Sequence, residues 1–268
     1  MKTRILDLDF KNATPKLAGT FPDRSHVTLT LHTATRVTAP DGRLLAVLLP
    51  NAIPEAEYLL AYELWKPVDG LVSNRATAVG TRSLPRTTNK YGIPSPRSGV
   101  NVRVLEVTEA RQGILGYLDR PNCRGTLLSR EHPEMIEGNR HLIEHIDSLY
   151  AQHLPDVHAQ QRREVEKAGS SWRLWNTVFS TVYLAKNFRT AYHTDRGNLR
   201  GVMTALMPTG KFTGGELVLS RWRIAIAFKP GDLLLFDPQQ LHGNLPFEGE
   251  RISAAFYCAQ RIADCGRQ

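Results

Sequence analysis

Two histidines and one aspartate have residue types and a spacing that suit metal binding. His193 and Asp195 are two positions apart, and residues i and i+2 of a β-strand point to the same face. His242 follows later, in the stretch LLLFDPQQLHGN that comes directly after a Lys-Pro-Gly-Asp turn at 229–232. Two imidazoles and one carboxylate on one face are typical of Fe(II) sites that keep open coordination positions. We expect these three residues to bind Fe(II) and to leave room for a bidentate cosubstrate and dioxygen.

An arginine follows this set in a position that suits carboxylate binding. Arg251 opens the segment RISAAFY, and its planar guanidinium can form two parallel hydrogen bonds with a carboxylate. Ser253, two residues on, shares that strand face and adds a hydroxyl donor. Each of these features alone is common in purely structural positions. Their ordered combination along one segment instead predicts a single site inside one barrel.

The elements that must position these residues are mainly short strands. From Thr177 onward, apolar runs separated by Gly, Pro and Asn turns predict a β-sandwich or jelly roll. Helical periodicity upstream predicts supporting helices and therefore an α+β fold. The predicted strands cover 27–36, 102–107, 113–118, 177–185, 199–206, 216–220, 223–229, 232–236 and 252–258, with a turn and then a buried strand within 41–50. The predicted helices cover 54–65, 133–151 and 157–167.

The charge of the chain favours a polyanionic partner. The 268 residues include 34 Lys and Arg against 26 Asp and Glu, a formal net charge of +8. No acid occurs between Asp69 and Glu106, and residues 70–105 are predicted to form a long basic loop. Nucleic acid is the polyanion that such a loop suits, although improved solubility is an alternative reason for the charge. The basic residues in this stretch are Arg75, Arg82, Arg86, Lys90, Arg97 and Arg103.

Composition argues against a membrane or secreted protein. No run of 18 apolar residues appears, and the segment 1–7 lacks an apolar signal core. The three cysteines, Cys123, Cys258 and Cys265, form no CxxC pair, which predicts a reducing compartment and no disulfide framework. We therefore expect an intracellular soluble protein, cytoplasmic or nucleoid/nuclear.

A second string with metal-binding spacing lies on the predicted helix 133–151. His141, Glu144 and His145 form the pattern HxxEH of inverted zinc peptidases, and histidines four apart face the same side of a helix. The sequence shows no convincing third ligand. An exposed amphipathic helix is therefore the favoured interpretation.

The C-terminal half resembles the 2-oxoglutarate/Fe(II) dioxygenases, and more closely their TET/JBP branch of phage and fungal type. The resemblance covers about residues 98–260 and implies a double-stranded β-helix (jelly-roll, cupin-like) core with supporting helices. We therefore expect one dioxygenase domain over 1–268, with an N-terminal extension over 1–100 that includes the basic loop, and a catalytic core with supporting helices over 100–260. The strings that carry it are HTDRGN at 193–198, GKFTGGEL at 210–217, RISAAFY at 251–257, NFRTA at 187–191, GILGYLDR at 113–120 and CRGT at 123–126.

Residue roles are implied by the same resemblance. Ala259 departs from the pattern, because base-reading members carry a histidine there. By resemblance His193, Asp195 and His242 match the iron ligands, Arg251, Ser253 and Arg189 match cofactor-binding positions for 2-oxoglutarate, and Asn198 and Tyr257 match residues that contact and stack on the target base.

The function implied is oxidation of a pyrimidine methyl group in double-stranded DNA, with Fe(II), 2-oxoglutarate and dioxygen. The product would be 5-hydroxymethylcytosine from 5-methylcytosine, or 5-hydroxymethyluracil from thymine, with the extent of oxidation left open. A methyl group inside a duplex is out of reach, so the nucleotide must be flipped out. No membrane or protein partner is implied. The alternatives are a hydroxylase of a small molecule or protein side chain, and a non-catalytic DNA-binding module, which an intact metal set disfavours.

Overall fold

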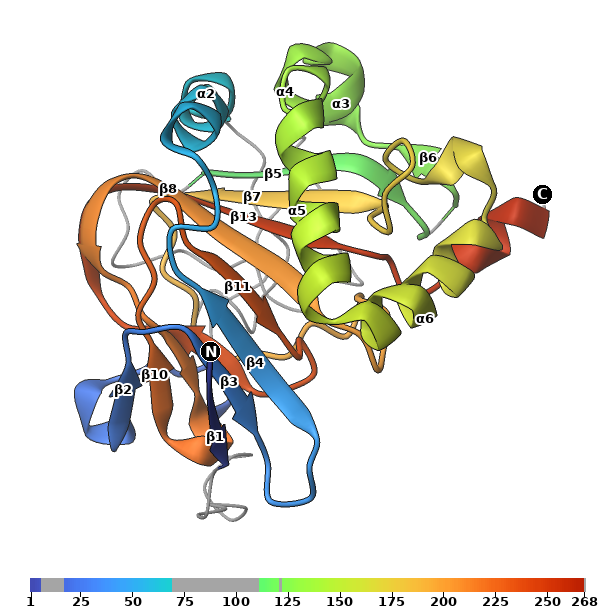
Figure 1. Cartoon of the computed structure of the whole chain (residues 1–268). Helices are drawn as coiled ribbons and strands as arrows, with labels where there is room; N and C mark the ends of the chain where they lie inside the picture. The colour runs from blue at the N-terminus through green and yellow to red at the C-terminus, as the bar shows by residue number, and fades with distance from the viewer. Residues whose placement is uncertain (6–16, 69–110, 121, 268) are drawn as a thin grey trace.

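A computed structural model of the chain describes residues 1–5, 17–68, 111–120 and 122–267. The predicted basic loop at 70–105 and the predicted strand at 102–107 lie outside these residues. Within them, two β-sheets form the centre of the molecule and helices gather on one side (Figure 1).

The larger sheet has nine strands, one of which carries Arg251. Its two longest strands are neighbours, and they pair antiparallel from Phe247 opposite Gly214 to Phe256 opposite Ala205. In sheet order the strands are β1 (Lys2–Ile5), β3 (Thr35–Thr38), β4 (Leu44–Leu49), β11 (Leu233–Phe236), β8 (Thr204–Gly214), β13 (Phe247–Tyr257), β7 (Thr181–Lys186), β5 (Arg111–Leu118) and β6 (Arg124–Gly125).

The smaller sheet packs on one face of the larger one. In order, its strands are β12 (His242–Asn244), β9 (Leu217–Leu219), β10 (Ile224–Ile226) and β2 (Leu29–Leu31). Apolar side chains from both sheets share one buried cluster, in which Leu219 and Ile226 meet Leu48 and Leu234. The runs of alternating or continuous apolar residues therefore form a two-layer sandwich, as the sequence predicts.

Helices cover the outer face of the larger sheet. Ile252, Ala254 and Phe256 of β13 pack there against buried helix residues such as Trp65 and Ile143. The helices are α2 (Glu55–Trp65), α3 (Leu127–Glu131), α4 (Glu134–Glu137), α5 (Arg140–His153) and α6 (Pro155–Glu166), with short 3-10 turns η1 (Arg24–His26), η2 (Ser170–Trp172), η3 (Ser220–Trp222) and η4 (Ile262–Arg267). None of the helices in the described part of the chain has the length and apolar character needed to cross a membrane.

Two predicted elements are divided in the structure. The helix predicted over 133–151 is interrupted at Asn139, whose φ of −101° and ψ of 12° depart from helical values, so α4 and α5 are separate. The strand predicted over 27–36 divides into β2 and β3, which join different sheets. Alternation alone gives no sign of this change of sheet.

The expectation of no disulfide is wrong. Cys123 and Cys265 are joined by a disulfide, while Cys258 is free and buried. The two bonded residues are 142 positions apart in the sequence, and their Cα atoms lie 5.6 Å apart. Sequence spacing cannot reveal a pair that only the tertiary fold brings together.

Candidate active site

The three predicted metal ligands meet where the two sheets approach each other. His193 and His242 form a small antiparallel bridge, in which each backbone amide donates to the other's carbonyl oxygen at 2.8 and 2.9 Å. Asp195 follows on the same segment, and its amide donates to the carbonyl of Pro238 at 2.9 Å. Backbone pairing thus positions all three side chains before any metal binds.

Both imidazoles are held in the orientation that a metal requires. Nδ1 of His193 lies 2.8 Å from the carbonyl oxygen of Ala191, and Nδ1 of His242 lies 2.8 Å from that of Gln240. A carbonyl can only accept, so each Nδ1 donates, and each Nε2 keeps its lone pair for a ligand. These contacts with backbone carbonyls therefore select the tautomer that coordinates metal.

The ligating atoms are close enough to share one ion. Nε2 of His193 lies 3.5 Å from one carboxylate oxygen of Asp195, and Nε2 of His242 lies 3.9 Å from the other. All three ligating atoms lie within 4.8 Å of one another. Two neutral imidazoles and a carboxylate fit Fe(II) and leave positions open.

Two further residues hold the metal-binding segments together, and the sequence analysis predicts a role for neither. Gln239 donates from Nε2 to the carbonyl oxygen of Asp195 at 3.1 Å, and so connects the loop before His242 with the His-x-Asp segment. Gly243 allows β12 to pack closely against the backbone at Thr190, because a Cβ at this position would lie 3.0 Å from the carbonyl oxygen of Thr190. The glutamine has no signal in the sequence beyond its place in the string DPQQLHGN.

Arg251 lies buried on β13 with its charge unpaired by any carboxylate among the described residues. Its guanidinium carbon is 5.2 Å from the ring centres of Phe212 and Phe228 and 5.4 Å from that of Phe247. Its Nε has no hydrogen-bond partner. Burial lowers the pKa of Arg251 to about 10, although the nearby carboxylate of Glu216 opposes that shift. A buried guanidinium with a free donor fits a carboxylate ligand.

Ser253 and Arg189 have different surroundings. Ser253 is half-buried and alternates with the helix-facing Ile252 and Ala254, so it shares the inward face of β13 with Arg251. Arg189 donates from Nη2 to the carbonyl of Pro22 at 2.6 Å and from Nε to that of Asn244 at 3.3 Å. In this arrangement Arg189 ties the N-terminal segment to β12.

Asn198 is buried beside the metal-binding segment. Its Nδ2 donates to Oγ1 of Thr204 at 2.9 Å, and its backbone amide donates to the carbonyl of Asp195 at 3.0 Å. Its Oδ1 is buried without a hydrogen-bond partner. Ala259, the residue that departs from the expected histidine, forms a backbone bridge with Asn198.

Tyr257 lies at the end of β13 among apolar side chains. The residue is 6% exposed and belongs to a buried cluster that includes Val165, Leu199 and Cys258. Because side chains alternate between the two faces of a strand, Tyr257 lies on the same face of β13 as Arg251 and Ser253.

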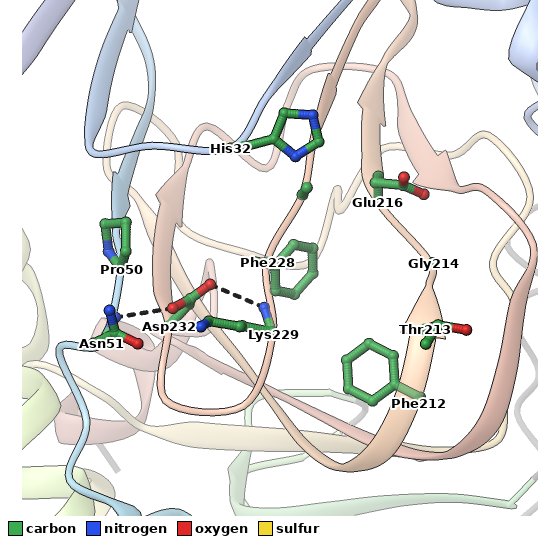
Figure 2. A pocket seen from close by; sticks show the side chains of 11 residues that line it. His32, Pro50, Asn51, Phe212, Thr213, Gly214, Glu216, Phe228, Lys229 and Asp232 are labelled. Atoms are coloured by element: carbon green, nitrogen blue, oxygen red, sulfur yellow. Dashed lines mark hydrogen bonds between the residues drawn. The ribbon is translucent and has the colours of Figure 1, made fainter.

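A pocket of about 440 Å³ lies beside Arg251 (Figure 2). It opens between the turn after β8 and the turn before β11, and its lining includes Phe212, Phe228, Glu216 and Lys229. Two of the rings around Arg251 therefore also form a wall of this pocket, which contains none of the three metal ligands.

Residues 116–260 match the Tet_JBP family, the oxygenase domain of the 2OGFeDO superfamily. The bifunctional helicase and thymine dioxygenase JBP2 of Leishmania infantum is 34% identical over 208 residues, which are 75% of this chain and 16% of that protein. The thymine dioxygenase JBP1 of Trypanosoma brucei brucei is 27% identical over 250 residues, which are 88% of this chain and 26% of that protein. The chain thus spans less than a third of either relative.

A solved structure, NgTET1 in complex with 5mC DNA, superposes with a TM-score of 0.65 at 14% identity, over 98% of this chain and 83% of that one. At this identity the likeness shows the fold, and it confirms the α+β architecture with a double-stranded β-helix core. The superfamily uses Fe(II) and 2-oxoglutarate, which the His-Asp-His set and the unpaired Arg251 fit. The chain belongs to the Tet_JBP family of oxygenase domains.

Proposed function

We propose that this protein is an Fe(II)- and 2-oxoglutarate-dependent dioxygenase that hydroxylates the 5-methyl group of a pyrimidine in double-stranded DNA. The observation that carries the proposal is one connected site: the His193–Asp195–His242 set is linked, through Asn244 of β12 and the carbonyl oxygen of Gly215, to the buried Arg251 of β13, which forms no ion pair with a carboxylate of the described residues. Family membership and relatives named as thymine dioxygenases support the same chemistry.

The protein's own residues bind and orient the reactants. His193, Asp195 and His242 hold the iron, which when bound supplies oxidation of a methyl group by dioxygen with 2-oxoglutarate as cosubstrate. Arg251 binds the distal carboxylate of 2-oxoglutarate, with Ser253 beside it on the inward face of β13. The rings around Arg251 exclude water, which strengthens this charge pair.

Asn198 is the candidate reader of the flipped base. Its unpaired Oδ1 can accept a hydrogen bond from a pyrimidine N–H, and this buried acceptor has no other partner. We retain Tyr257 as the candidate stacking residue and Arg189 as a candidate cofactor contact.

Arginines beside the metal-binding segment suit the phosphates of duplex DNA. Arg196 and Arg200 are exposed on either side of Gly197 and Asn198. Arg120 is exposed as well, and its Nη2 would lie 3.1 Å from a Cβ built on Gly197. These cations are placed to contact the backbone flanking a flipped nucleotide.

Thymine is the first base to test, because the relatives with substantial sequence identity are named for it. The experiment measures succinate release with three duplexes. The first contains thymine, the second contains 5-methylcytosine, and the third contains only uracil and cytosine as pyrimidines and so has no 5-methyl group. The proposal expects turnover that depends on a 5-methylpyrimidine and that is lost in Asp195→Ala. Equal succinate release with all three duplexes, together with hydroxylation of a small molecule or a peptide, would contradict the proposal.

A further inference from the structure

Glu216 is a buried acid that the proposed reaction does not use. It directly follows Gly215, whose carbonyl oxygen accepts a hydrogen bond from Arg251, and its side chain is only 10% exposed. Glu216 and two of the rings around Arg251, those of Phe212 and Phe228, line the same pocket (Figure 2). Burial lowers the pKa of Arg251, and the negative charge of Glu216 opposes that shift. The acid and the guanidinium therefore share one part of the protein interior.

The carboxylate of Glu216 nevertheless binds a different arginine. Its Oε1 accepts a hydrogen bond from Nη2 of Arg24, which lies in the 3-10 turn η1 and is 60% exposed. Its Oε2 is buried without a hydrogen-bond partner, and Nε of Arg251 is buried without one as well. Buried polar atoms in folded proteins are nearly always hydrogen-bonded. Two unpartnered atoms of opposite charge in one region therefore indicate that something keeps them from pairing.

We propose that Arg24 is a positioning residue for 2-oxoglutarate, because it holds the carboxylate of Glu216 away from Arg251 and keeps that guanidinium open to the distal carboxylate of the cosubstrate. This inference rests on the proposed function, in which Arg251 binds that carboxylate. Without Arg24, two carboxylates would compete for one buried guanidinium. The charge of Arg24 also balances that of Glu216, whose repulsion of a dicarboxylate would be strong where little water screens it.

The two members of this ion pair should have opposite effects on cosubstrate affinity. Arg24→Gln deprives the Glu216 carboxylate of its partner, so the carboxylate turns to Arg251 and the Kd for 2-oxoglutarate should rise by at least about tenfold. Glu216→Gln removes the competing charge and should leave the Kd at or below that of the wild type. A contact that only fastens η1 to the core would behave differently, because losing either partner would break it in the same way.

The test measures the binding of 2-oxoglutarate to the Fe(II)-loaded protein by calorimetry without oxygen, so that no turnover is needed. Arg24→Lys keeps the charge and should bind as the wild type does. Arg24→Gln combined with Glu216→Gln should regain wild-type affinity, because the competing charge is gone. Arg223→Gln is the matched control. Nη2 of Arg223 donates to the carbonyl of Ser25 at 2.7 Å, so this variant loosens the same turn while Arg24 and Glu216 both stay in place.

Three results would overturn the role of Arg24. One is equal weakening of binding by Arg24→Gln and Glu216→Gln, and another is a rise of the Kd in Arg223→Gln as large as that in Arg24→Gln. The third is unchanged binding in Arg24→Gln while Arg251→Ala loses it, which leaves the proposed function intact. Wild-type affinity in Arg251→Ala would instead refute the cosubstrate role of Arg251, and the role of Arg24 with it. Thermal unfolding checks that each variant is folded.

Discussion

Asn244 and Arg251 donate hydrogen bonds to the same acceptor, the carbonyl oxygen of Gly215, at 3.1 and 3.0 Å. Asn244 lies two positions after His242 on β12, whereas Arg251 lies on β13 of the other sheet. Only glycine fits at the shared position, because its φ is +76° and an added Cβ would collide with Nη1 of Arg251. One backbone carbonyl thus connects the metal-binding strand with the carboxylate-binding arginine.

The first prediction concerns this connection. Asn244→Ala removes the side-chain amide that donates to the Gly215 carbonyl, and so makes the position of Arg251 less well fixed. Losing one buried hydrogen bond costs about 1–2 kcal/mol, which corresponds to a rise of roughly tenfold in the KM for 2-oxoglutarate. Steady-state kinetics measures KM, and metal titration should show iron affinity nearly unchanged. A variant with weakened iron binding and a normal KM would show that the amide supports His242 instead.

The second prediction concerns the charge at position 251. Arg251→Ala should raise the KM for 2-oxoglutarate by orders of magnitude, since leaving one partner of a buried ion pair alone costs about 3–5 kcal/mol.

Arg251→Lys should add a pH dependence that the wild type lacks near neutrality. Burial lowers the pKa of the arginine to about 10, so the guanidinium stays charged up to that pH. The same burial would also lower the pKa of a lysine at this position, and a lysine starts from a lower pKa than an arginine. As the pH rises from neutrality toward about 10, the KM for 2-oxoglutarate of Arg251→Lys should therefore rise before that of the wild type, because the ammonium loses its proton first. Parallel pH profiles of KM in the two proteins would exclude a buried lysine that binds the carboxylate.

The third prediction separates base reading from loop support at Asn198. If its unpaired Oδ1 accepts a hydrogen bond from the base, Asn198→Ala should lower kcat/KM for methylated duplex. The expected decrease corresponds to a loss of about 1–3 kcal/mol of transition-state stabilisation. Thr204→Val is the matched control, because it removes the internal partner of the amide and leaves Oδ1 in place. The control should lower the melting temperature with little change in kcat/KM. Equal kinetic losses in the two variants would assign Asn198 to loop support alone.

The fourth prediction concerns the phosphate contacts of Arg120 and Arg196. Each phosphate contact adds about 0.9 to the slope of log affinity against log salt concentration. Replacing both arginines by glutamate should lower that slope by about 2 and weaken binding to all duplexes alike. Arg4→Glu, at an exposed position on the distant edge strand β1, is the control. If the slope of the double variant matches the control, the DNA lies elsewhere on the molecule.

The parts of the site that could be predicted from the sequence are those with local signals. His193, Asp195 and His242 could be predicted because a metal ion requires particular ligand types, and the His-x-Asp spacing places two of them on one side of the chain. The helix over 54–65 is confirmed as α2, since proline, glutamate and apolar periodicity mark its start and its length.

The remainder depends on contacts between distant segments. Gln239 and Asn244 act through backbone carbonyls, whose positions no sequence pattern specifies. Glu57 reaches His145 across 88 positions, and Cys123 reaches Cys265 across 142. Pairings at such separations depend on the way β-strands and helices assemble, so only the folded structure reveals them.

The central claim is that this site transfers oxygen from dioxygen to a pyrimidine methyl group in DNA. The most direct measurement is mass spectrometry of nucleosides from duplex DNA that has been incubated with the protein, Fe(II), 2-oxoglutarate and isotopically labelled dioxygen. We predict a 5-hydroxymethylpyrimidine nucleoside that carries the heavy oxygen, and its absence with Asp195→Ala. Succinate formation by the wild type without any labelled hydroxymethyl nucleoside would contradict the claim.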